Sequence, residues 1–168
     1  MKKTRRLTYD SLLMAVALTI FMVEAQIPPV VPISGMKAGL SNIVTLYAMF
    51  AVGPLDALGI LLGRIFLGSV FSGQMMSMIY SLSGGMLSYL VTLLLHLRMT
   101  KDQIWLCSII GAMAHNIGQM AAAVAVTRTV GLVVYLPVLL LGGIVTGAFT
   151  GLCAQLLVRR GMPGNMKK

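Results

Sequence analysis

The sequence predicts an all-α integral membrane protein with six transmembrane helices in a single membrane domain covering residues 1–168. Of the 168 residues, 58% are hydrophobic and only four are acidic, and the mean hydropathy is +0.92. Apolar runs of about 20 residues, the length that crosses a bilayer as a helix, follow one another with short breaks. A soluble domain of this size could not bury that much apolar surface. We therefore expect a multi-pass protein of the cell membrane, in contact with lipid.

Basic residues predict the orientation of the chain in the membrane. They gather before the first span, in one internal loop and after the last span: Lys2, Lys3, Arg5, Arg6, Arg98, Lys101, Arg159, Arg160, Lys167 and Lys168. Positive residues beside transmembrane helices favour the cytoplasmic side. Both termini are therefore expected in the cytoplasm, which requires an even number of spans. Topology accounts for the net charge of +9, and no nucleic-acid partner is expected.

Six spans are expected at residues 9–26, 38–52, 55–71, 75–97, 103–126 and 130–158. The first runs outward and is interpreted as a retained helix, because no small-residue cleavage site follows its apolar run. Three prolines at positions 28, 29 and 32 end it and begin an outer loop. The second span returns to the inside and ends at Gly53 and Pro54. The third runs outward and carries Arg64.

The fourth span returns to a cytoplasmic loop at residues 98–101, the fifth runs outward, and the sixth returns to the basic tail. No linker or convincing internal repeat interrupts this order. Cys107 and Cys153 lie in separate apolar segments without a metal-ligand spacing, so they are interpreted as buried thiols. No metal and no cofactor is expected.

Arg64 is the strongest single indication of a functional site, because it lies inside the apolar run of residues 59–71 (GILLGRIFLGSVF). A charged residue at membrane depth costs about 2.5–3.5 kcal/mol on insertion scales. It is tolerated when it faces a cavity, a partner charge or a ligand. A structural ion pair with Glu24 and a role in a binding site both remain open.

Other polar residues fall in the outer half of the predicted bundle when depth is assigned from the alternating directions of the spans. The predicted ligand-binding set is Glu24, Lys37, Asn42, Arg64, Tyr80, His115, Asn116, Gln119 and Tyr135. Together they predict an outward-facing cavity whose cations favour an anionic group and whose apolar walls suit a ring-bearing or hydrocarbon body. Phosphorylated, carboxylated and quinone-like ligands remain open. Packing roles for His115 and the asparagines, and membrane anchoring by Lys37, are the alternatives.

Small residues recur at every fourth position on several spans, a pattern typical of close helix–helix contact in lipid. Most of these faces are expected to pack inside the bundle. The face of the first span formed by Ser11, Ala15 and Thr19 is the candidate surface for docking a partner subunit.

Several segments of the chain resemble one family. They are residues 35–42 (GMKAGLSN), Gly63 with Arg64, residues 80–85 (YSLSGG), 111–119 (GAMAHNIGQ), 135–137 (YLP) and 142–147 (GGIVTG). The resemblance covers residues 8–158, and its family is described both as heptaprenyl diphosphate synthase component I and as the Gx transporter family. That family is similar to the substrate-binding S components of energy-coupling factor transporters. The resemblance implies six helices, an outer pocket, a lid after the first helix and docking through the first helix.

The chain is not expected to be an enzyme by itself. Prenyl chain elongation needs clustered aspartates that hold magnesium against a diphosphate, and the four acidic residues here are far apart in sequence. The leading hypothesis is a transport subunit that binds a small anionic, isoprenoid, flavin or quinone-like molecule. Since the chain has no P-loop, an ATPase or membrane partner would supply energy. The alternatives are a non-catalytic subunit of an isoprenoid, quinone or flavin-linked electron-transfer system beside redox membrane subunits, and a structural scaffold.

Overall fold

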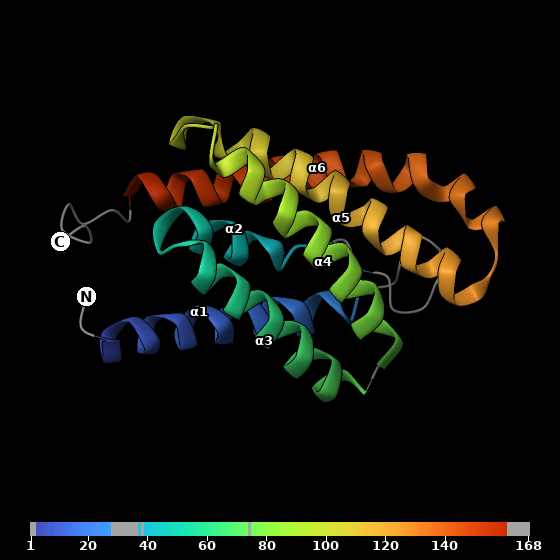
Figure 1. The fold of residues 1–168 in the computed structure, drawn as a ribbon, viewed down its shortest axis with the longest axis horizontal. Helices are drawn as coiled ribbons and strands as arrows, with labels where there is room; N and C mark the ends of the chain where they lie inside the picture. Colours follow the sequence, from blue (N-terminus) through green and yellow to red (C-terminus); the bar gives the residue numbers. More distant parts are fainter. Residues whose placement is uncertain (1–2, 28–36, 38, 74, 161–168) are drawn as a thin grey trace.

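The computed structural model describes residues 3–27, 37, 39–73 and 75–160, and this part of the chain is helical with short connections (Figure 1). Its elements are α1 (Lys3–Glu24), α2 (Asn42–Ala51), α3 (Pro54–Ser72), α4 (Met75–His96), η1 (Lys101–Gln103), α5 (Ile104–Thr127), η2 (Val130–Tyr135) and α6 (Leu136–Arg160). Helices satisfy their backbone hydrogen bonds internally, as a bilayer requires.

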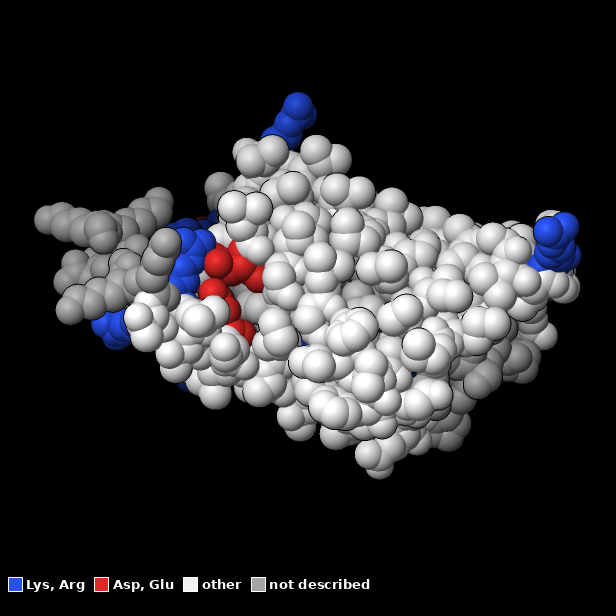
Figure 2. Space-filling model, turned by 60° about the horizontal axis from the view of Figure 1, so that its bottom comes forward, with Lys and Arg blue, Asp and Glu red and all other residues white. Residues whose placement is uncertain are grey.

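The six α-helices alternate in direction, so the start of α1 and the end of α6 lie at the same end of the bundle (Figure 1). We call this the termini end, and we call the opposite end, where α1 and α5 finish, the far end. Two ion pairs lie at the termini end: Arg6 with Asp56, and Arg159 with Asp102 at 2.5 Å. Figure 2 shows acidic and basic atoms side by side near one end of the face in view, and a broad uncharged surface beside them.

The outer surface carries many large apolar side chains. Phe66, Leu141 and Phe149 are each more than 60% exposed. Such a surface is unfavourable in water and normal against lipid tails. Within the described residues, five helices are long and apolar enough to cross a bilayer.

The second helix is shorter than the span expected at residues 38–52. It contains ten residues, which at 1.5 Å per residue gives about 15 Å, or about half of the hydrocarbon thickness. Gly39 adopts a φ of +79°, in the left-handed region, before it, and Pro54 starts α3 directly after Gly53. The sixth expected span, 130–158, agrees with the apolar segment Val130–Arg160, which is long enough to cross a bilayer. Its first six residues form the 3-10 helix η2, and α6 follows directly.

Glycines bring α4, α5 and α6 into close contact. A Cβ atom on Gly118 would lie 2.8 Å from the Cα of Gly84, and one on Gly147 would lie 2.8 Å from the Cα of Ile109. These distances leave no room for a side chain, so α5 packs almost backbone to backbone against both neighbours.

The short helix α2 occupies the middle of the bundle, where it contacts α1, α3, α4, α5 and α6. Its residues Val44, Leu46, Ala48 and Met49 are buried in the main hydrophobic core. Helix α1 packs on α3, with Phe21 against Gly68. This arrangement directs the start of α2 toward the middle of α3, where Arg64 lies.

Candidate functional site

Arg64 is held by the segment that begins α2. The side chain is only 2% exposed, and its two terminal nitrogens donate to the Ser41 hydroxyl and to Asn42 Oδ1. Among the described residues, the ion pairs are those at the termini end, and none joins Arg64 to Glu24. The guanidinium is therefore oriented by neutral groups, and the ion pair that the sequence left open is not formed.

Glu24, the last residue of α1, binds the backbone that precedes α2. Its Oε1 accepts from the N–H groups of Gly39 and Leu40, the latter at 3.3 Å. Glu24 is 4% exposed. The carboxylate therefore ties the far end of α1 to the segment that orients Arg64.

Lys37 lies over the face of Phe21, with Nζ 3.4 Å from the ring centroid. An ammonium in this position is attracted by the negative face of the ring. Burial lowers the pKa of Lys37 to about 8, with the negative charge of Glu24 opposing this shift and the positive charge of Arg64 adding to it. The three charged side chains therefore form one electrostatic group, which we call the arginine cluster: Glu24, Lys37 and Arg64.

His115 and Gln119 stand one turn apart on α5 and are buried next to this cluster. Gln119 Oε1 accepts a hydrogen bond from the backbone N–H of Lys37 at 3.4 Å. The amide nitrogen of Gln119 therefore faces His115 and lies 2.7 Å from its Nε2 atom. A Cβ on Gly39 would lie 2.9 Å from the His115 ring. Gly39, three residues before the start of α2, therefore lies directly against the imidazole of His115.

Each charged side chain of the arginine cluster keeps one buried polar atom that has no hydrogen-bond partner among the described residues. These atoms are Glu24 Oε2, Lys37 Nζ and Arg64 Nε. Leaving a buried polar atom unpaired costs about 1–3 kcal/mol, and more when the group is charged. The cluster therefore has hydrogen-bonding capacity that its contacts with the described residues do not use.

Three other residues of the predicted ligand-binding set, Asn116, Tyr80 and Tyr135, make contacts elsewhere in the bundle. Asn116 is buried and donates to the Leu139 carbonyl of α6 at 2.6 Å. Tyr80 packs in a small apolar group with Met120 and Ala123. Tyr135 lies in η2 and is 39% exposed. The structure does not bring these three side chains together with the arginine cluster.

The candidate docking residues Ser11, Ala15 and Thr19 are all exposed on α1. The hydroxyls of Ser11 and Thr19 donate to carbonyls of their own helix, at 2.9 Å each. The face they form is therefore smooth and weakly polar, and the described helices of the bundle do not cover it.

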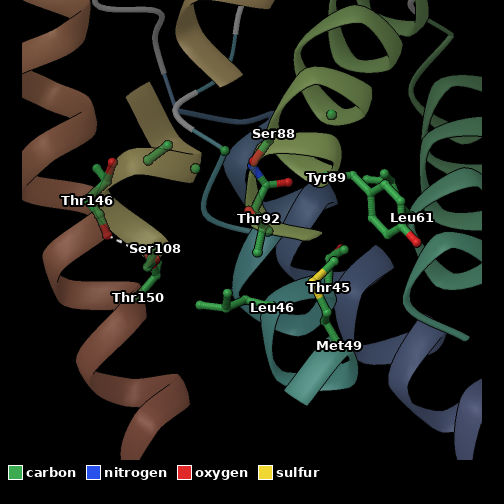
Figure 3. Close-up of a pocket in the computed structure, with 15 residues that line it drawn as sticks. Thr45, Leu46, Met49, Leu61, Ser88, Tyr89, Thr92, Ser108, Thr146 and Thr150 are labelled. Carbon is green, nitrogen blue, oxygen red and sulfur yellow. Dashed lines mark hydrogen bonds between the residues drawn. The ribbon is translucent and has the colours of Figure 1, made fainter. Parts of the chain in front are cut away.

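A narrow cavity lies beside the arginine cluster, because Asn42, which accepts a hydrogen bond from Arg64, lines it together with Thr45 and Met49 further along α2. Figure 3 shows residues of its wall. It encloses about 460 Å³ of empty space, its open mouth included. Six of its lining residues carry an aliphatic hydroxyl: Thr45, Ser88, Thr92, Ser108, Thr146 and Thr150. Of the predicted ligand-binding residues, Asn42 lines it.

These hydroxyl residues were not predicted from the sequence to line a site, although they carry a recognisable signal. Ser88 and Thr92 are spaced i, i+4 on α4, and Thr146 and Thr150 have the same spacing on α6, so each pair shares a helix face. Single hydroxyls are common in transmembrane helices, where they bond to their own backbone. Only the packing of α2, α4, α5 and α6 shows that these faces meet.

An all-helical bundle with an apolar exterior and a buried charged cluster defines a helical membrane protein with an internal polar site. Residues 13–157 match the model of the family described as heptaprenyl diphosphate synthase component I. The chain belongs to this family, which confirms the resemblance seen in the sequence. Comparisons with curated proteins and with solved structures gave no match.

Proposed function

We propose that this protein is a substrate-binding transport subunit, similar to the S components of energy-coupling factor transporters. It captures a small anionic ligand, with an isoprenoid, flavin-like or quinone-like body, at the arginine cluster. The site opens outward, at the far end of the bundle.

The observation that carries this proposal is the set of unpaired polar atoms in the arginine cluster. Two cations and one carboxylate give the cluster a net positive charge, and Arg64 Nε and Lys37 Nζ are free to donate. An anionic oxygen placed between them would satisfy both donors through charge-assisted hydrogen bonds. Ser41 and Asn42 already hold the guanidinium in place, so little ordering is needed on binding.

A partner subunit would provide the energy for transport. The exposed face at Ser11, Ala15 and Thr19 is the proposed docking surface, because its side chains allow another helix to approach closely. An ATPase with its own membrane subunit is the partner class that the resemblance implies.

We also propose that the chain does not catalyse prenyl transfer by itself. Within the described residues, no group of three or more His, Cys, Asp or Glu side chains could hold a metal ion. Asp10 lies beside Asp56, but Arg6 occupies both oxygens of Asp56. This pair is therefore a poor site for magnesium diphosphate.

The family description supports a second candidate function. It names a component of a synthase, which is compatible with a non-catalytic membrane subunit in an isoprenoid, quinone or flavin-linked electron-transfer system. Copurification with redox or prenyl-transfer subunits, without ligand transport, would favour this alternative.

The proposal is tested by thermal unfolding of the detergent-purified protein with a panel of prenyl diphosphates, flavins, short quinones and vitamins. A ligand at about a hundredfold excess over its Kd stabilises the folded state by about 2.7 kcal/mol. We expect saturable stabilisation by an anionic member of the panel. Arg64→Met should weaken that binding about tenfold to a hundredfold, because it removes charge-assisted hydrogen bonds.

Arg98→Met is the matched control, since Arg98 is exposed just after the end of α4. Ligand binding should be unchanged in this variant. Equal ligand affinity in wild type and a folded Arg64→Met would contradict the proposal. So would stabilisation by neutral members of the panel alone.

A further inference from the structure

The hydroxyl-lined cavity of Figure 3 plays no part in the proposed function, and its lining suggests a separate role. Its described lining residues include no Asp, Glu, Lys, Arg or His. Thr45 and Met49 reach it from α2, Ser88 from α4 and Ser108 from α5 (Figure 3). Walls that are neutral and rich in hydroxyls suit a small uncharged group that both donates and accepts hydrogen bonds.

Thr45 provides independent evidence for such a group. Its side chain is only 6% exposed, it lines the cavity, and its Oγ1 has no hydrogen-bond partner in the part of the chain that the structure describes. Other hydroxyls of the wall are bonded, as between Ser108 and Thr150 at 3.1 Å. A buried hydroxyl is normally satisfied by protein or by ordered water. The Thr45 hydroxyl is therefore an unsatisfied buried polar group in a residue of the cavity wall.

We propose that this cavity is an internal water-binding site. Water is small enough for the narrow space, and polar cavities of this kind retain it where several polar groups converge. A metal cation is disfavoured, because the lining has no carboxylate and the Arg64 charge lies close by. An apolar group would leave Thr45 unpaired.

The water site is joined to the arginine cluster by two shared residues. Asn42 lines the cavity and accepts a hydrogen bond from Arg64, and Gly39 lines it and donates to Glu24. Helix α2 runs from Asn42 through Thr45 and Met49 toward the termini end. The bound water therefore forms a hydrated compartment between the arginine cluster and the termini end.

This compartment extends the polar interior beyond the cluster. If the ligand captured at the arginine cluster moves from there toward the termini end, it would meet a hydrated space on leaving Arg64. That interpretation rests on the proposed function, whereas the hydration itself does not.

The cavity offers two matched pairs of reporter residues for a test by X-ray radiolytic labelling. A synchrotron pulse generates hydroxyl radicals from water, and these oxidise buried side chains only where water is bound close by. Met49 and Tyr89 line the cavity, while Met120 and Tyr80 do not. All four are buried, at 2%, 6%, 3% and 4% exposure in that order.

In the wild-type protein, we expect Met49 and Tyr89 to be oxidised several-fold faster than Met120 and Tyr80. Equal, slow rates at all four residues would show a dry cavity and overturn the proposal. Labelling needs no transported ligand, so this failure would leave the proposed function standing. If no ligand raised the unfolding temperature, that result would contradict the proposed function and would not affect the proposal of a water site.

Thr45→Val removes the hydroxyl while keeping the shape of the side chain, and Met49 lies one turn away on the same face of α2. We expect the oxidation rate of Met49 to fall several-fold in this variant and that of Met120 to stay constant. Thr19→Val is the matched control, because that hydroxyl is exposed and bonds within α1. An unchanged rate at Met49 in a folded Thr45→Val would overturn the assignment.

Discussion

Arg64 and Lys37 show two ways in which a cation is accommodated inside this bundle. The guanidinium of Arg64 is fixed by two neutral oxygens, which orient it without neutralising its charge. The ammonium of Lys37 rests on an aromatic ring, and this contact opposes the cost of burial. Neither cation is cancelled by a direct ion pair among the described residues. The arginine cluster therefore keeps a net positive charge that no direct ion pair among the described residues cancels.

The lowered pKa of Lys37 predicts a pH dependence of stability. Its pKa falls from 10.5 to about 8 on folding, so between these values the unfolded chain binds more protons than the folded one. The free energy of unfolding should therefore rise with pH across that window. Thermal unfolding of the ligand-free protein, followed from below the lower pKa to near the upper one, measures this rise.

Lys37→Met should remove the part of this rise that comes from the ammonium. Lys101→Met, at an exposed position in η1, should retain it. Identical pH profiles for wild type and Lys37→Met would contradict the pKa assigned to Lys37. In wild type, anion binding should weaken as the pH passes about 8, because Lys37 then loses its charge.

At the scale of the helices, the contacts of α5 depend on glycine. A Cβ on Gly118 would meet the backbone of α4 at Ser83 and Gly84, 2.8 Å from the Ser83 carbonyl oxygen. The same approach places Gln119 and His115 of α5 against Gly84. The contact between Gly118 and Gly84 therefore sets both the packing of α5 on α4 and the position of His115.

Gly118→Ala should destabilise the protein by about 1–3 kcal/mol, the usual cost of overpacking. The reason is that its Cβ would meet backbone atoms, which cannot move aside as a flexible side chain could. Thermal or denaturant unfolding in detergent measures the change.

Gly59→Ala is the matched control within a helix, because no atom of the described residues lies within 4 Å of a Cβ at Gly59. It should be neutral or stabilising by about 0.5–1 kcal/mol, since alanine favours a helix more than glycine does. Equal effects of the two substitutions would show that the α4–α5 contact is looser than described.

On the scale of the whole molecule, charge lies at the ends of the bundle and apolar surface lies between them. The ion pairs of Arg6 with Asp56 and of Arg159 with Asp102 join α1 to α3 and α6 to the turn before α5 at the termini end. Arg128 lies at the far end, directly after α5. The prediction that the termini end faces the cytoplasm rests on the basic residues of the sequence that gather there.

The predicted orientation is tested with reporter fusions. Green fluorescent protein fused after residue 168 should fluoresce, and alkaline phosphatase at the same place should be inactive, because both report a cytoplasmic terminus. Alkaline phosphatase inserted after Arg128 should be active. Active phosphatase at the C-terminus would reverse the orientation, and with it the side of the membrane from which the proposed site would take its ligand.

The amino-acid pattern alone was enough to predict a helical membrane protein, its family and the approximate positions of its helices. The reason is that a bilayer forces each span to satisfy its own backbone, so the relevant hydrogen bonds are local in sequence. The pattern also identified Arg64, because the energetic cost of a charge in an apolar run depends only on the run itself.

The partners of Arg64 depended on tertiary structure. Ser41 and Asn42 reach it because α2 is short and sits in the middle of the bundle, a placement that hydropathy does not encode. The hydroxyl-lined cavity arises in the same way, since Thr45, Ser88 and Ser108 meet only when α2, α4 and α5 are packed together. Side-chain hydrogen bonds between helices are set by distances and angles across the bundle, whereas each helix forms from its own residues.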